Sequence, residues 1–244
     1  MVNSINIIPL TSLSIAFIPV AIALYFLYRW SLNTKNAFYA IIRMLVQLLI
    51  VGNVLGYIFH SDSAGLITII LVVMVLLSSW IALNTIETNR IKLLVPTIVA
   101  ITIGGGFTLL MISQGVLQLT PWYQPQVLIP LAGMIFANAM NSVSICAERL
   151  FSELKNNTPY VQARNNALNA ASIPVVNSLF AVGIVSLPGM MTGQILSGVS
   201  PLIAARYQIM VMCMIFASAI ISSVLFLILA KTQMKTLMGD VVKD

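Results

Sequence analysis

Seven apolar runs, each close to a membrane's thickness in length, recur along this chain of 244 residues. A helix that crosses a bilayer needs about 20 predominantly apolar residues, and short polar stretches separate the runs from one another. The pattern therefore predicts an all-α fold, a polytopic transmembrane helical bundle of about seven spans. The predicted spans are Ile8–Tyr28, Ala37–Phe59, Ala64–Asn84, Leu93–Ile112, Val127–Ala147, Ile173–Leu196 and Tyr207–Ala230.

The composition favours the same class and excludes a water-soluble protein. Hydrophobic residues make up 59% of the chain and charged residues 7%, with a mean hydropathy of +1.01. A soluble domain carries about 25% charged residues, so this chain could not cover a surface in water and must contact a lipid bilayer. The spans leave little sequence for anything else, and we expect a single transmembrane domain over residues 1–244.

The basic residues predict the orientation of the spans. Of the 12 Lys and Arg residues, all but Arg206 fall on one side when successive loops are assigned to alternate sides. Cytoplasmic loops carry the excess of Lys and Arg, which places the N-terminus outside and the C-terminus in the cytoplasm. This asymmetry accounts for the net charge of +6 without a nucleic-acid partner. The cytoplasmic set is Arg29, Lys35, Arg43, Arg90, Lys92, Arg149, Lys155, Arg164, Lys231, Lys235 and Lys243.

One cytoplasmic connection, residues 148–172, is longer than the others. Its pattern predicts two short amphipathic helices, the first over Glu148–Lys155 and the second starting at Thr158–Pro159. Thr158 suits an N-cap, proline suits the first helical position, and Asn156–Asn157 suits a turn. Such a pair indicates either docking to another protein or a position on the membrane surface.

The sequence contains no motif for nucleotide binding or hydrolytic chemistry. A G-x-x-x-x-G-K-[ST] phosphate loop is absent, as are HExxH, CxxC and GxSxG motifs. Gly104–Gly106 lacks the lysine and lies in a span, where helix flexibility or close packing explains it. We therefore expect no catalytic residue and no cofactor bound by this chain, and no metal ligand is assigned.

Polar side chains within the spans are candidates for a translocation path. Arg43 and Gln47 are one helical turn apart in the second span, where Arg43 either extends to the interface or faces a path. Asn138 and Asn141 share one face of the fifth span. Amides in a membrane helix are costly unless they find partners or line a water-filled path, so interhelical bonding and a path both stay open.

The sixth span supplies further path or gate candidates. Pro188–Gly189 interrupts it, and Asn177 adds an amide. Broken helices at membrane depth are tolerated where they are buried or line a cavity. Met190 and Met191 follow the break. Thioethers bind soft metals, although methionine more often fills apolar gaps.

Four sequence blocks then give the chain a specific likeness. They are R-x-L-V-Q-L-L-I-V-G at Arg43–Gly52, I-P-L-A-G-M at Ile129–Met134, V-S-L-P-G-M-M-T-G at Val185–Gly193, and Y-Q-I-M-V at Tyr207–Val211. With these blocks the chain resembles the permease subunits of the iron-export type of bacterial ABC transporter. Plant aluminium-tolerance permeases belong to the same family.

The resemblance implies a permease in the bacterial inner membrane that forms a homodimer with two cytoplasmic ABC ATPase chains. ATP and Mg would bind to the ATPase. Residues 148–172 would then be the coupling segment, and the family is proposed to export iron, so export of iron or another metal or small solute is expected. The candidates for ATPase coupling are Glu153, Asn157, Thr158, Pro159 and Arg164.

The chain also departs from the family pattern. Asn177–Ala181 stands where the family usually has an Asp-x-x-Lys-Thr arrangement, and Ala137 replaces the usual glycine. If the missing charges contact the substrate, the substrate differs. Two other classes stay open: an ion-gradient-driven secondary transporter or channel, which the broken span and the amides favour, and a non-transporting assembly factor.

Overall fold

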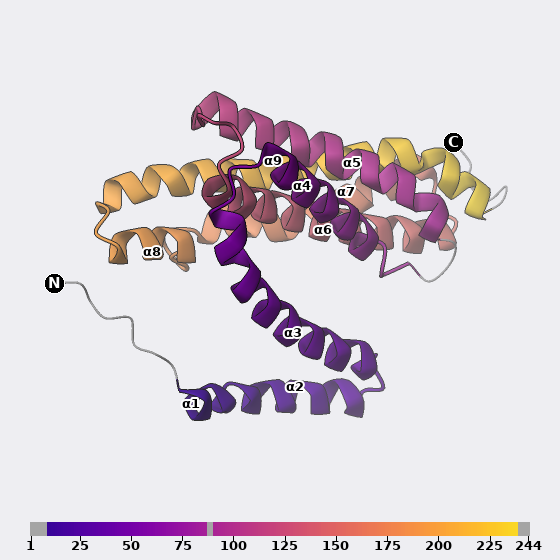
Figure 1. Ribbon diagram of the computed structural model, residues 1–244. Helices are drawn as coiled ribbons and strands as arrows, with labels where there is room; N and C mark the ends of the chain where they lie inside the picture. The colour runs from indigo at the N-terminus through magenta and orange to yellow at the C-terminus, as the bar shows by residue number, and fades with distance from the viewer. Residues whose placement is uncertain (1–8, 87–89, 239–244) are drawn as a thin grey trace. The chain divides into compact units, whose positions relative to one another are not determined.

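The computed structural model describes residues 9–86 and 90–238, which divide into two units, Met1–His60 and Ser61–Asp244 (Figure 1). Among the described residues every regular element is a helix, and only an isolated bridge joins Val182 to Ser186. The all-α prediction is confirmed. Six of the described helices are long and apolar enough to cross a membrane. Ile8, where the first predicted span begins, lies outside the described residues, and the single domain stays a prediction.

The first unit contains three helices: α1 (Leu10–Ile15), α2 (Phe17–Arg29) and α3 (Thr34–Phe59). Asn33 caps α3, because its side chain accepts a hydrogen bond from the backbone N–H of Asn36 at 3.3 Å. The described side chains of α2 and α3 include none that is buried within the chain. Since lipid tails are as apolar as leucine, such helices need no protein cover in a bilayer.

The second unit is built around its last helix. Helix α9 (Pro201–Met238) contacts α5 (Arg90–Leu110), α6 (Pro125–Lys155), α7 (Tyr160–Ala181) and α8 (Gly189–Leu196). Helix α4 (Ala64–Ala82) packs on α5 and α6, and the π-helix η1 (Met111–Val116) continues α5. Fully buried Ile135, Leu150 and Phe226 lie in this core.

Glycine explains how closely α5 approaches its neighbours. A Cβ atom on Gly104 would lie 2.8 Å from the backbone nitrogen of Ser222 on α9, and one on Gly105 would lie 2.9 Å from the ring of Phe136. A Cβ on Gly106 would meet open space. Close packing therefore accounts for the first two residues of the Gly104–Gly106 run.

Serine hydroxyls join the helices inside the core. The hydroxyls of Ser142 on α6 and Ser223 on α9 are 2.8 Å apart, and Ser218 donates to the carbonyl of Ile135 at 3.5 Å. Hydrogen bonds of this kind hold membrane helices together where the hydrophobic effect gives no driving force. The apolar bundle thus has a polar seam along α9.

The predicted boundaries between Ala147 and Leu196 are wrong. Helix α6 runs unbroken to Lys155, because nothing between Ala147 and Lys155 stops a helix, so Glu148–Lys155 is no separate helix. Likewise α7 runs from Tyr160 through Pro174 to Ala181, and joins the second cytoplasmic helix to the start of the sixth span.

The predicted sixth span, Ile173–Leu196, is two helices rather than one. The chain turns after Ala181, where Gly183 adopts φ +82° and its N–H bonds to the carbonyl of Ser186 at 2.9 Å. A positive φ of this size suits glycine, which has no Cβ. Pro188 then occupies the N-cap position of α8. The interruption is confirmed, but it lies at residues 182–188 and Pro188 starts a helix rather than kinking one.

Most of the basic residues of the second unit lie at one end of its helices. Figure 1 shows that the ends of α4, α6 and α9 and the starts of α5 and α7 lie at the same end of this unit. These ends carry Arg90, Lys92, Arg149, Lys155, Arg164 and Lys231, whereas Arg206 lies near the start of α9 at the opposite end. The observed arrangement agrees with the charge argument. Lys243 lies outside the described residues, and the number of crossings and the sides of the termini stay predictions.

Candidate functional site

A cavity of about 320 Å³ lies among α6, α7, α8 and α9, and we call it the membrane cavity. Asn138 of α6 and Gln208 of α9 line it, together with Ser178 of α7 and Ser186 of the turn after α7. These side chains give the cavity hydrogen-bonding groups within an otherwise apolar bundle. Irregular backbone at membrane depth is tolerated where it lines a cavity, which is the position of the turn at residues 182–188.

Asn138 connects this cavity to a smaller one of about 100 Å³ along the groove between α6 and α7. Asn138 and Ser178 line both cavities, and Asn141 and Ser142 line the smaller one. The amide nitrogen of Asn138 donates to the carbonyl of Met134 at 2.8 Å within its own helix. Asn138 and Asn141 therefore border neighbouring cavities, in agreement with the prediction that they share one face of the helix.

The structure brings some of the predicted path residues together and leaves others apart. Asn138, Pro188, Gly189 and Met190 line the membrane cavity, and Asn141 lines the smaller cavity. Asn177 is exposed on α7 and Met191 is half-buried on α8, and both are absent from the linings of these two cavities.

Arg43 and Gln47 lie on α3, in the first unit. Arg43 is half-buried and Gln47 is exposed. Gly52 and Gly56 of the same helix have open space where a Cβ would be. A role for Arg43 and Gln47 in a translocation path stays a prediction.

The sequence prediction missed Gln208, Met212 and Ser178 as lining residues. Gln208 is 6% exposed, and its side-chain oxygen has no hydrogen-bond partner among the residues that the structure describes. An amide within an apolar span was a usable signal for this residue. Met212 is one of 13 methionines in the chain, and because a methionine in an apolar helix more often fills a gap than lines a path, nothing in the sequence set it apart from the others.

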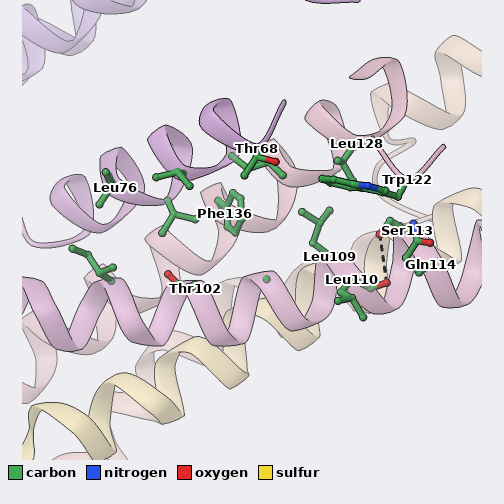
Figure 2. A pocket seen from close by; sticks show the side chains of 15 residues that line it. Thr68, Leu76, Thr102, Leu109, Leu110, Ser113, Gln114, Trp122, Leu128 and Phe136 are labelled. Atoms are coloured by element: carbon green, nitrogen blue, oxygen red, sulfur yellow. Dashed lines mark hydrogen bonds between the residues drawn. The ribbon is translucent and has the colours of Figure 1, made fainter. Parts of the chain in front are cut away.

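A second large pocket, of about 470 Å³, has different chemistry (Figure 2). It lies between α4, α5, η1 and α6, and Figure 2 shows Leu76, Phe136 and Leu109 pointing into it, with Trp122 at one end. Ser113 donates to the carbonyl of Leu110 at 3.4 Å. Thr68, Thr102, Ser113 and Gln114 also line it, but the lining surface is almost entirely apolar. This pocket is therefore a poor route for an ion or a polar solute, and we assign the candidate path to the membrane cavity.

The candidate coupling segment forms a cross-linked corner where α6 ends and α7 begins, and we call residues 148–166 the α6–α7 corner. Glu153 is its centre. One carboxylate oxygen lies 2.6 Å from Arg149 and accepts from the amide of Asn166 at 3.1 Å, while the other accepts from the hydroxyl of Thr158 at 2.9 Å. The last turn of α6 is thereby tied to the first turns of α7.

The backbone between the two helices makes the corner tight. Asn157 has φ +61°, the left-handed conformation that asparagine adopts at helix C-termini, so the predicted turn is confirmed. The predicted cap is wrong: α7 begins at Tyr160 with Pro159 in the N-cap position. The Thr158 hydroxyl bonds to Glu153 instead of capping α7.

Tyr160 anchors the corner to α9. Its side chain is 3% exposed, its hydroxyl donates to the carbonyl of Leu227, and the ammonium of Lys231 lies 5.4 Å from its ring centre. Burial raises the pKa of Tyr160 from its ordinary value of about 10 to about 12, so the phenol stays protonated and keeps donating to that carbonyl even in mildly alkaline solution. The corner is therefore fixed to the core through three helices.

Three coupling candidates lie on the outer surface of the corner. Asn157, Pro159 and Arg164 are exposed, and Arg164 donates to the side-chain oxygen of Asn165 at 3.3 Å. Glu153 and Thr158 are only partly exposed and bind each other. The predicted set thus divides into residues that a partner can reach and residues that shape the corner.

The described residues contain no cluster of three or more His, Cys, Asp and Glu side chains that could hold a metal. Cys146 is buried and Cys213 is exposed, and both are free thiols. A metal site of the imidazole, carboxylate or thiolate type with three such ligands is thus absent from the described part of the chain.

An apolar helical bundle with a polar cavity at a helix break defines this chain as a polytopic membrane protein. It belongs to the family described as "Uncharacterised protein family (UPF0014)", which matches residues 10–234. No solved structure matches the chain.

Three relatives illustrate the range of the family. The chain is 34% identical to "UPF0014 membrane protein slr1647" of Synechocystis sp., over 75% of this chain and 76% of that protein. It is 33% identical to "Probable iron export permease protein FetB" of Escherichia coli, over 88% and 87% of the two chains. It is 29% identical to "Protein ALUMINUM SENSITIVE 3" of Arabidopsis thaliana, over 86% and 81%.

Proposed function

We propose that this chain is the membrane-spanning permease subunit of an ABC transporter, powered by a separate cytoplasmic ATPase, and that it exports iron or another metal or small solute. The observation that carries the proposal is that the α6–α7 corner and the membrane cavity are built from the same two helices. Asn138 and Glu153 are 15 positions apart on α6, about 22 Å along its axis.

This continuity gives a physical route from ATP hydrolysis to the cavity. Glu153 ties α6 to α7 through Thr158 and Asn166, so a force on the corner moves both helices together. Further along the same helices, Asn138 near the middle of α6 and Ser178 near the end of α7 line the cavity. Because the helix is interrupted at residues 182–188, α7 can move relative to α8.

Family membership supports the direction and the cargo of the proposal. The Escherichia coli relative is named a probable iron export permease, and the likeness covers most of both chains. We extend its role as an export permease to this chain, with iron or another metal or small solute as the cargo, a homodimer of permease chains in the bacterial inner membrane, and ATP and Mg bound by the ATPase. The absence of a phosphate loop in this sequence fits that division of labour.

Capture of the ATPase tests the proposal. The tagged intact chain, purified in mild detergent from the cells in which it is naturally made, should retain a cytoplasmic ATPase with a phosphate-loop sequence. Arg164→Glu should weaken this capture by reversing an exposed charge on the corner. Arg206→Glu is the matched control, because Arg206 is also exposed but lies at the opposite end of the unit. Capture of no ATPase, or equal loss in both variants, would contradict the proposal.

A secondary transporter or channel is the second candidate, and the break between α7 and α8 beside the cavity favours it. Discontinuous helices that flank a polar site are typical of ion-coupled transporters. This candidate requires transport driven by an ion gradient without nucleotide. Such transport by the purified chain alone would select it over the ABC permease.

A further inference from the structure

Three methionines line the membrane cavity from three different helices. Met134 comes from α6, Met190 from α8 and Met212 from α9. Methionines that only fill gaps are enclosed, as Met214 is at 1% exposed. Met190, by contrast, is 37% exposed, and all three border an open space of about 320 Å³. The thioethers therefore border a space that a ligand can enter.

Gln208 adds a buried amide to the lining of the same cavity. It is 6% exposed, and its carbonyl oxygen lacks a hydrogen-bond partner among the described residues. Buried polar atoms in folded proteins are normally paired, and each exception calls for an explanation such as a ligand or an ion. The side chains of Gln208 and of the three methionines line the same cavity, and their oxygen and sulfur atoms are candidate donors for a cation.

We propose that the membrane cavity binds a soft monovalent metal cation, Cu(I), through the sulfurs of Met134, Met190 and Met212, with the amide of Gln208 beside them. Thioethers select Cu(I), whereas sites built mainly from carboxylate and carbonyl oxygens suit hard cations and imidazole suits many divalent metals. In this cavity three methionine sulfurs, rather than the single amide oxygen of Gln208, decide the choice of metal. Among the described residues that line the cavity there is no Asp, Glu, His or Cys.

Charge points to the same cation class. An ion transferred from water into an apolar interior is penalised strongly, and the Born penalty rises with the square of the charge. A cavity without an acidic residue therefore disfavours divalent and trivalent ions more than a monovalent one. The inference that Cu(I) is transported rests on the proposed permease function. The inference that Cu(I) binds in the cavity does not.

Binding to the purified full-length chain tests the proposal. The chain carries Cys213→Ser, because the exposed thiol of Cys213 would itself bind Cu(I). Cu(I) is titrated anaerobically in detergent against a coloured Cu(I) chelator. We expect one Cu(I) per chain. Loss of an outer-shell partner lowers metal affinity about 10- to 100-fold, so removing two ligands in Met134→Leu/Met212→Leu should lower it at least tenfold.

The controls separate ligand loss from damage to the fold. Leucine has a volume close to that of methionine, and Met210→Leu places the same change on α9 outside the cavity lining, so it should bind as before. Thermal unfolding checks that each variant is folded. If the double variant does not fold, the single Met212→Leu variant replaces it, with a smaller expected loss of Cu(I) affinity. Gln208→Leu should also weaken binding.

Any of three results would overturn the proposal. They are the absence of Cu(I) binding, equal binding by the folded methionine variants, and displacement of Cu(I) by equimolar Fe(II). The assay contains no ATPase and no nucleotide. Failure to capture an ATPase would therefore overturn the proposed function while leaving Cu(I) binding intact, and the reverse result would overturn only the metal assignment.

Discussion

Single residues set how closely the helices of the second unit approach one another. Gly104 is the clearest case, because a methyl group there would meet the hydroxyl of Ser222 at 2.4 Å and its backbone nitrogen at 2.8 Å. Backbone cannot rotate away as a side chain can. The residue two positions further along α5, Gly106, has no neighbour within 4 Å of a Cβ. The two glycines therefore make a matched pair.

We expect Gly104→Ala to destabilise the protein by about 1–3 kcal/mol, the usual cost of overpacking a core. Gly106→Ala should be neutral or stabilising by up to about 1 kcal/mol, because alanine is the better helix former. Thermal unfolding of the purified chain in one detergent measures both. Equal effects would show that Gly104 is not a contact between α5 and α9.

Serine at the α6–α9 contact gives a second test at this scale. Ser142 and Ser223 are both buried, and their hydroxyls are 2.8 Å apart. Ser223→Ala removes one partner, and we expect a loss of about 0.6 kcal/mol, the mean for side-chain hydrogen bonds between membrane helices. The double variant with Ser142→Ala should lose less than the sum of the single losses in the same unfolding measurement. Strict additivity would mean that the two hydroxyls do not interact.

At the scale of elements, the sequence predicted helices well and their ends poorly. The apolar runs reveal where helices lie, since an apolar stretch of that length has few other structures in a membrane. They do not reveal where α6 ends, because Glu148–Lys155 is a good helix sequence whether or not lipid surrounds it. Pro174 lies within α7, and Gly183 rather than Pro188 makes the turn. For α7, the helix continues through Pro174 while packing against α6 and α9.

The α6–α7 corner is the element whose rigidity the function requires. Glu153→Gln removes the ion pair with Arg149 and weakens the bonds from Thr158 and Asn166. We expect backbone amides of residues 154–166 to exchange with deuterium faster in this variant, because the corner opens more often. Glu148→Gln is the control on the same helix, since Glu148 is exposed and its carboxylate is not part of this network. Unchanged exchange in Glu153→Gln would show that the carboxylate does not hold the corner.

At the scale of the whole molecule, composition and charge identified the class of protein, because both are properties of the chain itself. The membrane cavity is different. Asn138 and Gln208 are 70 positions apart in the sequence, and only the packing of α6 against α9 brings them to one space. No single run of residues predicts that convergence, although each amide is visible in the sequence as a polar residue within an apolar span.

Orientation is the prediction that belongs to the whole molecule. In a Cys213→Ser background, Ser197→Cys lies in the connection between α8 and α9, and Lys155→Cys lies at the end of α6. Both positions are exposed. A thiol reagent that cannot cross membranes should label Ser197→Cys on intact cells and Lys155→Cys only after the membrane is opened. The reverse pattern would place the α6–α7 corner outside, where no cytoplasmic ATPase reaches it.

Transport in reconstituted vesicles tests the central claim most directly. The chain is placed in lipid vesicles either alone or with the ATPase that it captures, and the movement of iron and of Cu(I) across the membrane is measured. The account predicts movement only when the ATPase and hydrolysable ATP are both present, and none with a non-hydrolysable ATP analogue. Movement of either metal by the chain alone, driven by an ion gradient without nucleotide, would contradict it.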